Sequence, residues 1–163
     1  MITLPSFAEH FADLAGGYDV VLSDVWGVIH NGLESFPAAC DALARFRAKG
    51  GRVALITNAP RPGEVVVRLL DRLKVPRECF DAIVSSGDVT RSVMAARPDK
   101  AVFHIGPERD LPIFDGLGLT FVPFKRADYV VCTGLNDDEI ETPESYRELL
   151  TSIRARDLFM LCG

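Results

Sequence analysis

The sequence lacks the charge pattern of a nucleic-acid-binding protein. Its 163 residues include 18 Lys or Arg and 23 Asp or Glu, so the formal net charge at pH 7 is −5. No run or stripe of basic residues is present that could neutralise a row of phosphates. We therefore expect no nucleic-acid partner. A small anionic substrate is still compatible with the composition, because a local site can be positive on an acidic protein.

Long apolar runs are missing as well. A membrane-spanning helix needs about 18 or more consecutive apolar residues, and no segment of this sequence approaches that length. The N-terminal segment MITLPSFAEHFADLAGGYD has no basic region followed by an apolar run, which a secretory signal would have. We expect a cytoplasmic protein without a membrane partner.

Cysteine is scarce, and the cysteines are separated from one another by dozens of residues. They are Cys40, Cys79, Cys132 and Cys162. There is no Cys-x-x-Cys pair and no histidine close by, which argues against zinc and redox motifs. We expect reduced and mostly buried thiols, in agreement with a cytoplasmic location.

What the sequence does contain is an alternation of short apolar segments with helical ones. Strands are expected at residues 19–25, 52–57 and 80–86, and helices at 36–50, 61–75 and 87–98. The strand segments are nearly continuously apolar, which is typical of strands buried on both faces of a parallel sheet. With 48% hydrophobic residues the chain can build a real core. This order predicts an α/β fold with an open, doubly wound parallel sheet.

The same alternation restarts after Pro98. Strands are expected at residues 100–106, 119–124, 127–134 and 157–163, and helices at 107–118 and 142–156. Thr142 and Pro143 suit the N-cap and the first position of the last helix. We expect residues 1–98 to form a core domain. Residues 99–163 would form part of a second, incomplete α/β domain, because a buried-type strand is the last element of the sequence.

Polar residues finish the first three strands. In doubly wound sheets, ligands bind outside the carboxyl ends of the strands, and these ends carry Asp24, Thr57 with Asn58, and Ser85 with Ser86. An aspartate in this place can be a nucleophile that takes up a phosphoryl group. The hydroxyl of Thr57 could donate to that group, and Asn58 could orient the substrate. Taken alone, Asp24 could instead cap a turn, and Thr57 could simply be a β-branched residue at a strand end.

The loop that follows Asp24 could supply the rest of a phosphate site. The backbone N–H groups of Val25, Trp26 and Gly27 would point at the oxygens of the transferring group. A divalent cation would offset the combined charge of carboxylate and phosphate.

Three segments in particular carry a family resemblance. LSDVWGVIHNG, LITNAPR and SSGDVTR, in this order and at these intervals, resemble the haloacid dehalogenase superfamily. More narrowly they are similar to its subclass IIA, the NagD-like and p-nitrophenyl-phosphatase-like phosphatases of sugars or nucleotides. The resemblance runs over essentially the whole chain. It implies a Rossmann-like core with an α/β cap domain, of which this chain would contain a part.

The resemblance also implies roles for individual residues. Asp24 would be the nucleophile and a magnesium ligand, and Trp26 would give its backbone carbonyl to the metal. Thr57 would be the phosphate-binding hydroxyl. The implied cofactor is Mg²⁺, and the implied substrate is a small phosphorylated metabolite.

The sequence departs from the phosphatase pattern at Trp26. The family's phosphatases have a second aspartate there, which protonates the leaving oxygen and then helps water to attack the acyl-phosphate. Loss of a general acid or base typically lowers a rate by about 10²–10⁴-fold. We therefore expect poor turnover of unactivated phosphate esters. The haloacid dehalogenases themselves have an aromatic residue at this place, but the surroundings of Trp26 look more like the phosphatase subclass.

The second departure concerns the family's later motifs. A lysine and an acidic pair that completes the magnesium site lie beyond the cap in the family, and we expect this chain to stop inside the cap. Neither GDVTR at residues 87–91 nor NDDEIE at residues 136–141 supplies a substitute. We expect the 163-residue chain alone to be inactive, and its exposed apolar faces to favour a homo-oligomer.

Four further residues are weaker candidates. His30 and Asn31 could touch substrate from a mobile flap, although an ordinary turn through Asn31-Gly32 explains them as well. His104 is expected to be a packed histidine, and Arg61 could bind an anion or be an ordinary surface residue.

Three functions stay open. The first is a magnesium-dependent phosphatase that acts through an aspartyl-phosphate on a sugar phosphate or nucleotide. The alternative is an inactive pseudo-phosphatase that binds a phosphorylated ligand or a protein, which the tryptophan at position 26 favours. A third is aspartate-nucleophile chemistry at carbon.

Overall fold

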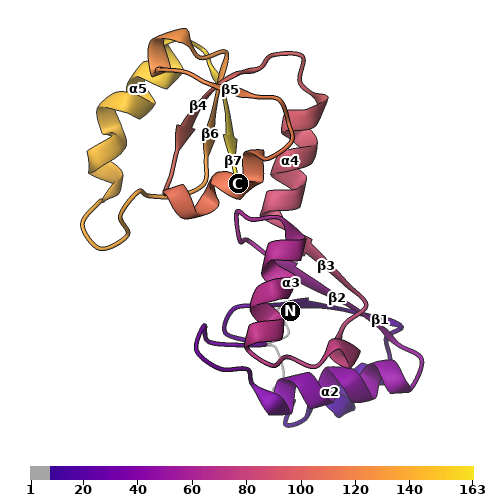
Figure 1. Ribbon diagram of the computed structural model, residues 1–163. Helices are drawn as coiled ribbons and strands as arrows, with labels where there is room; N and C mark the ends of the chain where they lie inside the picture. The colour runs from indigo at the N-terminus through magenta and orange to yellow at the C-terminus, as the bar shows by residue number, and fades with distance from the viewer. Residues whose placement is uncertain (1–7) are drawn as a thin grey trace, which may run out of the picture. The chain divides into compact units, whose positions relative to one another are not determined.

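The computed structural model describes residues 8–163, which form two compact units (Figure 1). The first comprises the chain up to Thr57 together with Val67–Val84, and the second comprises Asn58–Val66 together with Ser85–Gly163. Helix α4 (Ser86–Ala96) belongs to the second unit, although it precedes the expected boundary. The division into domains 1–98 and 99–163 stays a prediction, and its residues 1–7 lie outside the described part.

The first unit contains a three-stranded sheet in the order β1-β2-β3. Its strands are β1 (Val20–Asp24), β2 (Arg52–Thr57) and β3 (Ala82–Ser85), and the helices of this part of the chain are α1 (Phe11–Ala15), α2 (Pro37–Ala48), α3 (Gly63–Arg72) and the 3₁₀ turn η1 (Arg77–Cys79). Strands β1 and β2 run parallel, and their register pairs Asp24 with Ile56. The expected α/β alternation is confirmed, with ends that differ by a few residues.

The start, the buried face and the end of helix α2 all follow from its sequence. It begins at Pro37. Proline suits the first turn, because an N–H group there would have no partner within the helix. Its buried side chains, Cys40, Leu43 and Phe46, recur every three residues along one face. Gly50 follows the helix with a φ of 97°, a left-handed conformation that stops helices readily.

One face of the first sheet differs from the expectation. Val53 and Leu55 are buried, as a core strand requires. By contrast, Val20, Leu22, Ile56 and Val84 are between 43% and 66% exposed. The expectation that these strands are buried on both faces is therefore wrong for the face that carries these four side chains, which residues 8–163 leave about half exposed.

The second unit contains a four-stranded parallel sheet in the order β5-β4-β6-β7. Its elements are α4, β4 (Ala101–Ile105), η2 (Glu108–Phe114), β5 (Thr120–Phe121), η3 (Phe124–Arg126), β6 (Tyr129–Cys132), η4 (Pro143–Tyr146), α5 (Arg147–Ala155) and β7 (Phe159–Cys162). Tyr129, Val130 and Val131 are fully buried, so β6 is covered on both faces as the apolar run predicts.

Two helix predictions in this unit need refinement. The segment expected as a helix at 107–118 is the 3₁₀ helix η2, which contains Pro112 and cannot complete an α-helical hydrogen-bond ladder there. The helix expected at 142–156 begins as η4 and continues as α5. Thr142 and Ser145 form a capping box at its start, so the expected N-cap is confirmed.

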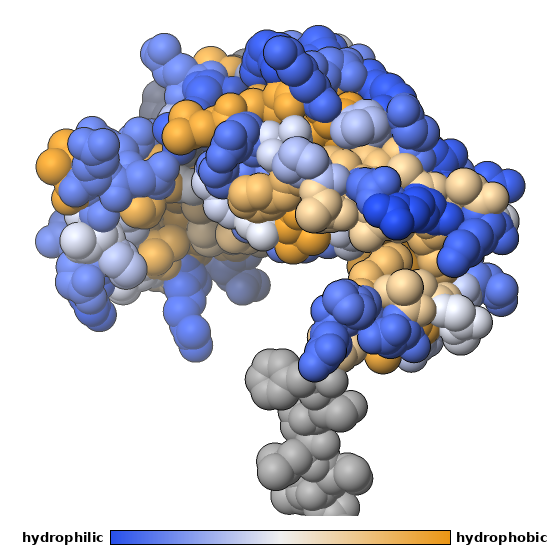
Figure 2. Space-filling model, turned by 90° about the horizontal axis from the view of Figure 1, so that it is seen from below, coloured by the Kyte–Doolittle hydropathy of each residue, from blue (hydrophilic) through white to orange (hydrophobic). Residues whose placement is uncertain are grey.

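The surface carries polar and apolar side chains side by side, as the face in Figure 2 illustrates. Within residues 8–163, no helix has the length and apolar character that crossing a membrane requires. All four cysteines are free thiols; Cys40 and Cys79 are buried, and Cys162 is exposed.

Candidate active site

Asp24 is the last residue of β1, and its side chain is exposed. One carboxylate oxygen, Oδ1, accepts a hydrogen bond of 2.7 Å from the backbone N–H of Val25. Because Asp24 pairs with Ile56, Thr57 lies one residue further along the neighbouring strand. The two strand ends that the sequence singled out therefore meet at the same edge of the sheet.

The loop after Asp24 is tightly folded. The N–H of Ile29 donates to the carbonyl of Val25 at 2.8 Å, and the N–H of Gly27 donates to the carbonyl of His30 at 2.8 Å. Val25 and Ile29 are buried and anchor the loop. The N–H groups of Val25 and Gly27 thus have partners inside the chain, and their role in binding phosphate stays a prediction.

Trp26 is held in place by two contacts although it is 62% exposed. Its ring meets the ring of His30 edge to face, with centroids 5.4 Å apart and planes at 82°. It also lies against Gly32, where a Cβ atom would come within 2.5 Å of the indole. Gly32 has a φ of 92°, so glycine suits this position for two separate reasons.

His30 is a packed residue of this loop. It is 2% exposed, and its Nδ1 accepts a hydrogen bond of 2.9 Å from the N–H of Gly32. Burial lowers the pKa of His30, which favours the neutral ring. The Oδ1 of Asn31 accepts from the N–H groups of Leu33 and Glu34, both at 2.9 Å. These contacts favour the ordinary turn over the substrate-binding flap.

Thr57 is buried at the end of β2, and the next residue, Asn58, is exposed. Their expected contacts with phosphate and substrate stay predictions. Arg61 forms an ion pair of 3.1 Å with Asp110, a carboxylate that is 2% exposed. The pair gives Arg61 a structural partner within the second unit, an arrangement that the sequence did not indicate.

Asp88 and Ser85 have structural roles at the start of α3 and α4. Asp88 accepts the backbone N–H of Gly63 with both carboxylate oxygens, at 3.0 and 3.1 Å, and so satisfies the start of α3. The hydroxyl of Ser85 donates to the carbonyl of Arg61 at 2.6 Å and accepts the N–H of Asp88 at 3.0 Å. The strand-end position of Ser85 was a signal for a polar role, but here that role is structural.

The donor atoms of the expected magnesium site are oxygens. A carboxylate from Asp24 and a backbone carbonyl from Trp26 are hard oxygen donors, which Mg²⁺ prefers. Mg²⁺ commonly takes one or two carboxylates, with water and substrate phosphate as its other ligands. Within residues 8–163 there is no group of three or more His, Cys, Asp or Glu side chains that could hold a metal. The donors present therefore fit magnesium in kind and form only part of a coordination shell.

Hydrogen bonds hold the acidic segment 136–141 in a defined conformation. The carboxylate of Glu141 accepts from the hydroxyl of Tyr146 at 2.5 Å and from the N–H of Asn136 at 2.7 Å. The bond from Tyr146 is the main reason why the pKa of Glu141 lies below its usual value. These contacts make the segment a structured loop.

His104 is packed in the second unit. Its Nε2 lies 2.9 Å from the hydroxyl of Thr133, and its ring centroid lies 4.9 Å from that of Phe114. Burial lowers the pKa of His104. The expectation of a packed histidine is confirmed.

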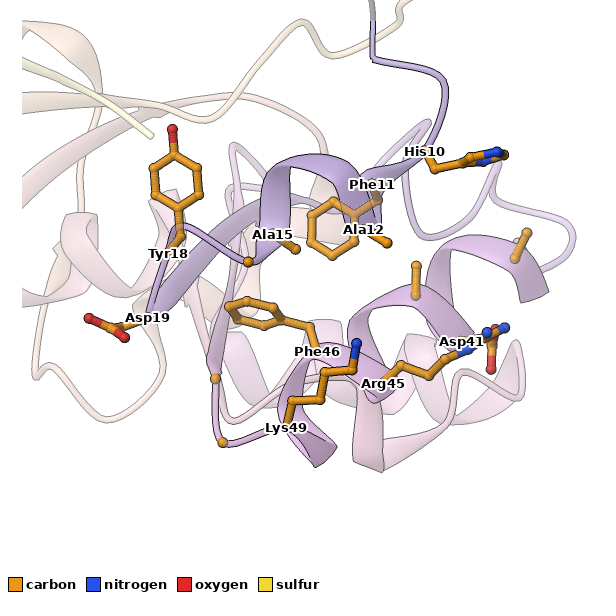
Figure 3. A pocket seen from close by; sticks show the side chains of 15 residues that line it. His10, Phe11, Ala12, Ala15, Tyr18, Asp19, Asp41, Arg45, Phe46 and Lys49 are labelled. Carbon is orange, nitrogen blue, oxygen red and sulfur yellow. The ribbon is translucent and has the colours of Figure 1, made fainter.

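A cavity of about 710 Å³ lies near the opposite end of β1 (Figure 3). Phe11 and Phe46 meet there edge to face at 6.0 Å, and Lys49 and the ion pair of Arg45 with Asp41 lie beside them. Its lining contains none of the expected site residues. The cavity is thus separate from the strand ends that carry Asp24 and Thr57.

Comparison with known proteins points to one family. The family model described as haloacid dehalogenase-like hydrolase matches residues 21–120. A haloacid dehalogenase-like hydrolase from Brucella suis 1330 is 50% identical, with a TM-score of 0.88 over 96% of this chain and 60% of that chain. No curated protein matches this chain.

More distant solved structures share the fold. A glycerol phosphate phosphatase from Mycobacterium tuberculosis, solved with magnesium, is 25% identical, with a TM-score of 0.58 over 86% of this chain and 43% of that chain. A 4-nitrophenylphosphatase from Thermotoga maritima is 22% identical, with a TM-score of 0.65 over 91% of this chain and 56% of that chain. The chain thus spans about 60% or less of the length of these three proteins.

Proposed function

The chain belongs to the haloacid dehalogenase-like hydrolase family. We propose that it is part of a magnesium-dependent phosphatase that acts on a small phosphorylated metabolite. The observation that carries the proposal is the position of Asp24 at the end of β1, next to the strand end that carries Thr57. A nucleophilic carboxylate at this edge of a parallel sheet would face the usual ligand crevice.

The proposed reaction has two steps. A carboxylate oxygen of Asp24 attacks phosphorus, and the bond between phosphorus and the leaving oxygen breaks. Water then attacks phosphorus in the aspartyl-phosphate, the bond between phosphorus and the Asp24 oxygen breaks, and the protons of the water pass to phosphate and solvent. Inorganic phosphate is released and the carboxylate is regenerated. The hydrogen bond from Val25 would hold the other carboxylate oxygen in a fixed direction.

The groups around Asp24 would bind the transferring phosphoryl group. The hydroxyl of Thr57 and the backbone N–H of Trp26 would donate to its oxygens, and Asn58 would orient the substrate. The N–H groups of Val25 and Gly27 would donate as well only after leaving their present partners, the carboxylate of Asp24 and the carbonyl of His30. Mg²⁺, held by the carboxylate of Asp24 and the carbonyl of Trp26, would supply positive charge opposite the phosphate. The magnesium in the Mycobacterium tuberculosis phosphatase supports this choice of metal.

The test uses the complete gene product. Release of phosphate is measured from sugar phosphates, nucleotides and 4-nitrophenyl phosphate, with and without magnesium, for wild type, Asp24→Asn and Asp19→Asn. We expect turnover that needs magnesium, is lost in Asp24→Asn and persists in Asp19→Asn, a matched control at the residue that precedes β1. Equal rates in wild type and Asp24→Asn would remove Asp24 as the nucleophile.

A pseudo-phosphatase is the second candidate, favoured by the tryptophan at position 26. It predicts binding of a phosphate ester, measurable by titration calorimetry, without turnover that depends on Asp24. The free thiols support a cytoplasmic location for either candidate. The exposed apolar face of the first sheet supports a homo-oligomer.

A further inference from the structure

The loop that follows Asp24 offers no side chain that can pass a proton to a leaving group. We propose that this site acts on activated phosphates, in which the leaving group is a carboxylate or a phosphate that departs without protonation. Such substrates are acyl phosphates and other phosphoric anhydrides. The inference rests on the proposed function and adds the substrate class.

The first support is the content of the loop. Between Asp24 and Gly32 the only ionisable side chain is His30. It is 2% exposed, and its Nδ1 is occupied by the N–H of Gly32, so it does not reach a substrate. The end of β2 adds a hydroxyl at Thr57 and an amide at Asn58, neither of which is an acid at neutral pH.

The second support is the fixed position of Trp26. Its indole lies against Gly32 and meets His30 edge to face. The backbone on either side of it is hydrogen-bonded, through the carbonyl of Val25 and the N–H of Gly27. The indole N–H can donate a hydrogen bond, but it does not transfer a proton. This exposed side chain, two residues after the nucleophile, therefore shapes the site without taking part in proton transfer.

Without an acid in the site, the reaction proceeds readily only when the leaving group needs no proton. When Asp24 attacks an acyl phosphate, the electron pair of the breaking bond stays on the leaving carboxylate, which is a weak base and needs no proton. The aspartyl-phosphate that forms is itself an acyl phosphate. In the second step the leaving group is the carboxylate of Asp24, and the protons of the attacking water pass to phosphate and solvent. Both steps therefore break the same kind of bond.

The experiment measures kcat/KM of the complete gene product for acetyl phosphate and for a series of aryl and alkyl phosphates with increasingly basic leaving groups. For wild type we expect a steep fall across the series, of about 10²–10⁴-fold relative to an acid-assisted enzyme. Trp26→Asp should make the dependence of kcat/KM on leaving-group basicity less steep and raise turnover of alkyl phosphates. Trp26→Phe is the matched control, since it keeps an aromatic ring without an acid and should keep the steep slope.

The outcomes separate this inference from the proposed function. Turnover that depends on Asp24 but has a flat slope in wild type would overturn the inference and leave the phosphatase standing. Turnover that is absent, or equal in Asp24→Asn, would overturn both. If Trp26→Asp fails to fold, the dependence of kcat/KM on leaving-group basicity in wild type still tests the inference.

Discussion

The indole of Trp26 lies so close to Gly32 that a Cβ atom at position 32 would come within 2.5 Å of Cη2 and 2.8 Å of Cζ3. The contact joins the residue two places after the candidate nucleophile to the glycine that ends the loop. Trp26 is also the only tryptophan of the chain, so the tryptophan fluorescence of the protein reports on the surroundings of this side chain.

Gly32→Ala should therefore disturb the loop in two ways. The φ of 92° strains any side chain, and the new methyl group would push the indole away. We expect a loss of about 1–3 kcal/mol in the free energy of unfolding and a shift of the tryptophan emission. Gly50→Ala is the control, because Gly50 has a φ of 97° but nothing within 4 Å of the added Cβ. An unchanged emission spectrum in Gly32→Ala would contradict the contact.

Asp81 predicts how stability depends on pH in the first unit. Its carboxylate accepts hydrogen bonds from Arg47 and from the N–H of Val53, both at 2.7 Å, and the bond from Arg47 is the main reason why its pKa falls to about 2. Because the pKa is lowered in the folded state, the ionised carboxylate stabilises the fold at any pH above its unfolded pKa of about 4. This stabilisation is lost as the pH falls towards 2. Asp81→Asn should lower the urea midpoint at pH 7 and make the midpoint less sensitive to pH between 4 and 2.

The comparison needs a carboxylate without such contacts. Asp19 is exposed, and within residues 8–163 its side chain has no hydrogen-bond partner. Asp19→Asn should leave both the midpoint at pH 7 and its acid dependence as in wild type. Parallel pH profiles for wild type and Asp81→Asn would show that the network around Asp81 does not contribute.

The ion pair of Arg61 with Asp110 gives the arginine a structural role, which a double-variant cycle can distinguish from that of an ordinary surface residue. Arg61→Met leaves a buried carboxylate without its partner, which should cost about 2–3 kcal/mol of unfolding free energy. The double variant with Asp110→Asn should lose less than the sum of the two single variants, because it removes the unpaired charge. Urea unfolding of the four proteins measures this coupling. Additive losses would mean that the arginine is an ordinary surface residue.

Much of this architecture could be predicted from sequence, because it depends on periodic patterns. The buried face of α2 and the apolar runs of β2 and β6 follow from local spacing, and Asp24 and Thr57 stand out because strand ends are recognisable. The burial of His30 depends instead on the left-handed φ of Gly32 and on packing within a loop, for which no periodic signal exists. The pairing of Arg61 with Asp110 joins residues that are distant along the chain, so spacing could not reveal it.

The exposed face of β1 could not be predicted either, because an apolar run reports that a strand can be buried and not what buries it. Leu22 is 66% exposed whereas Leu55 on the neighbouring strand is fully buried. Leu22→Ser should therefore change the free energy of unfolding by no more than about 0.5 kcal/mol, while Leu55→Ala should lower it by about 2–5 kcal/mol. If copies of the chain associate through this face, Leu22→Ser should also weaken that association in sedimentation velocity. A large loss of stability in Leu22→Ser at low protein concentration would show that the side chain is buried within one chain.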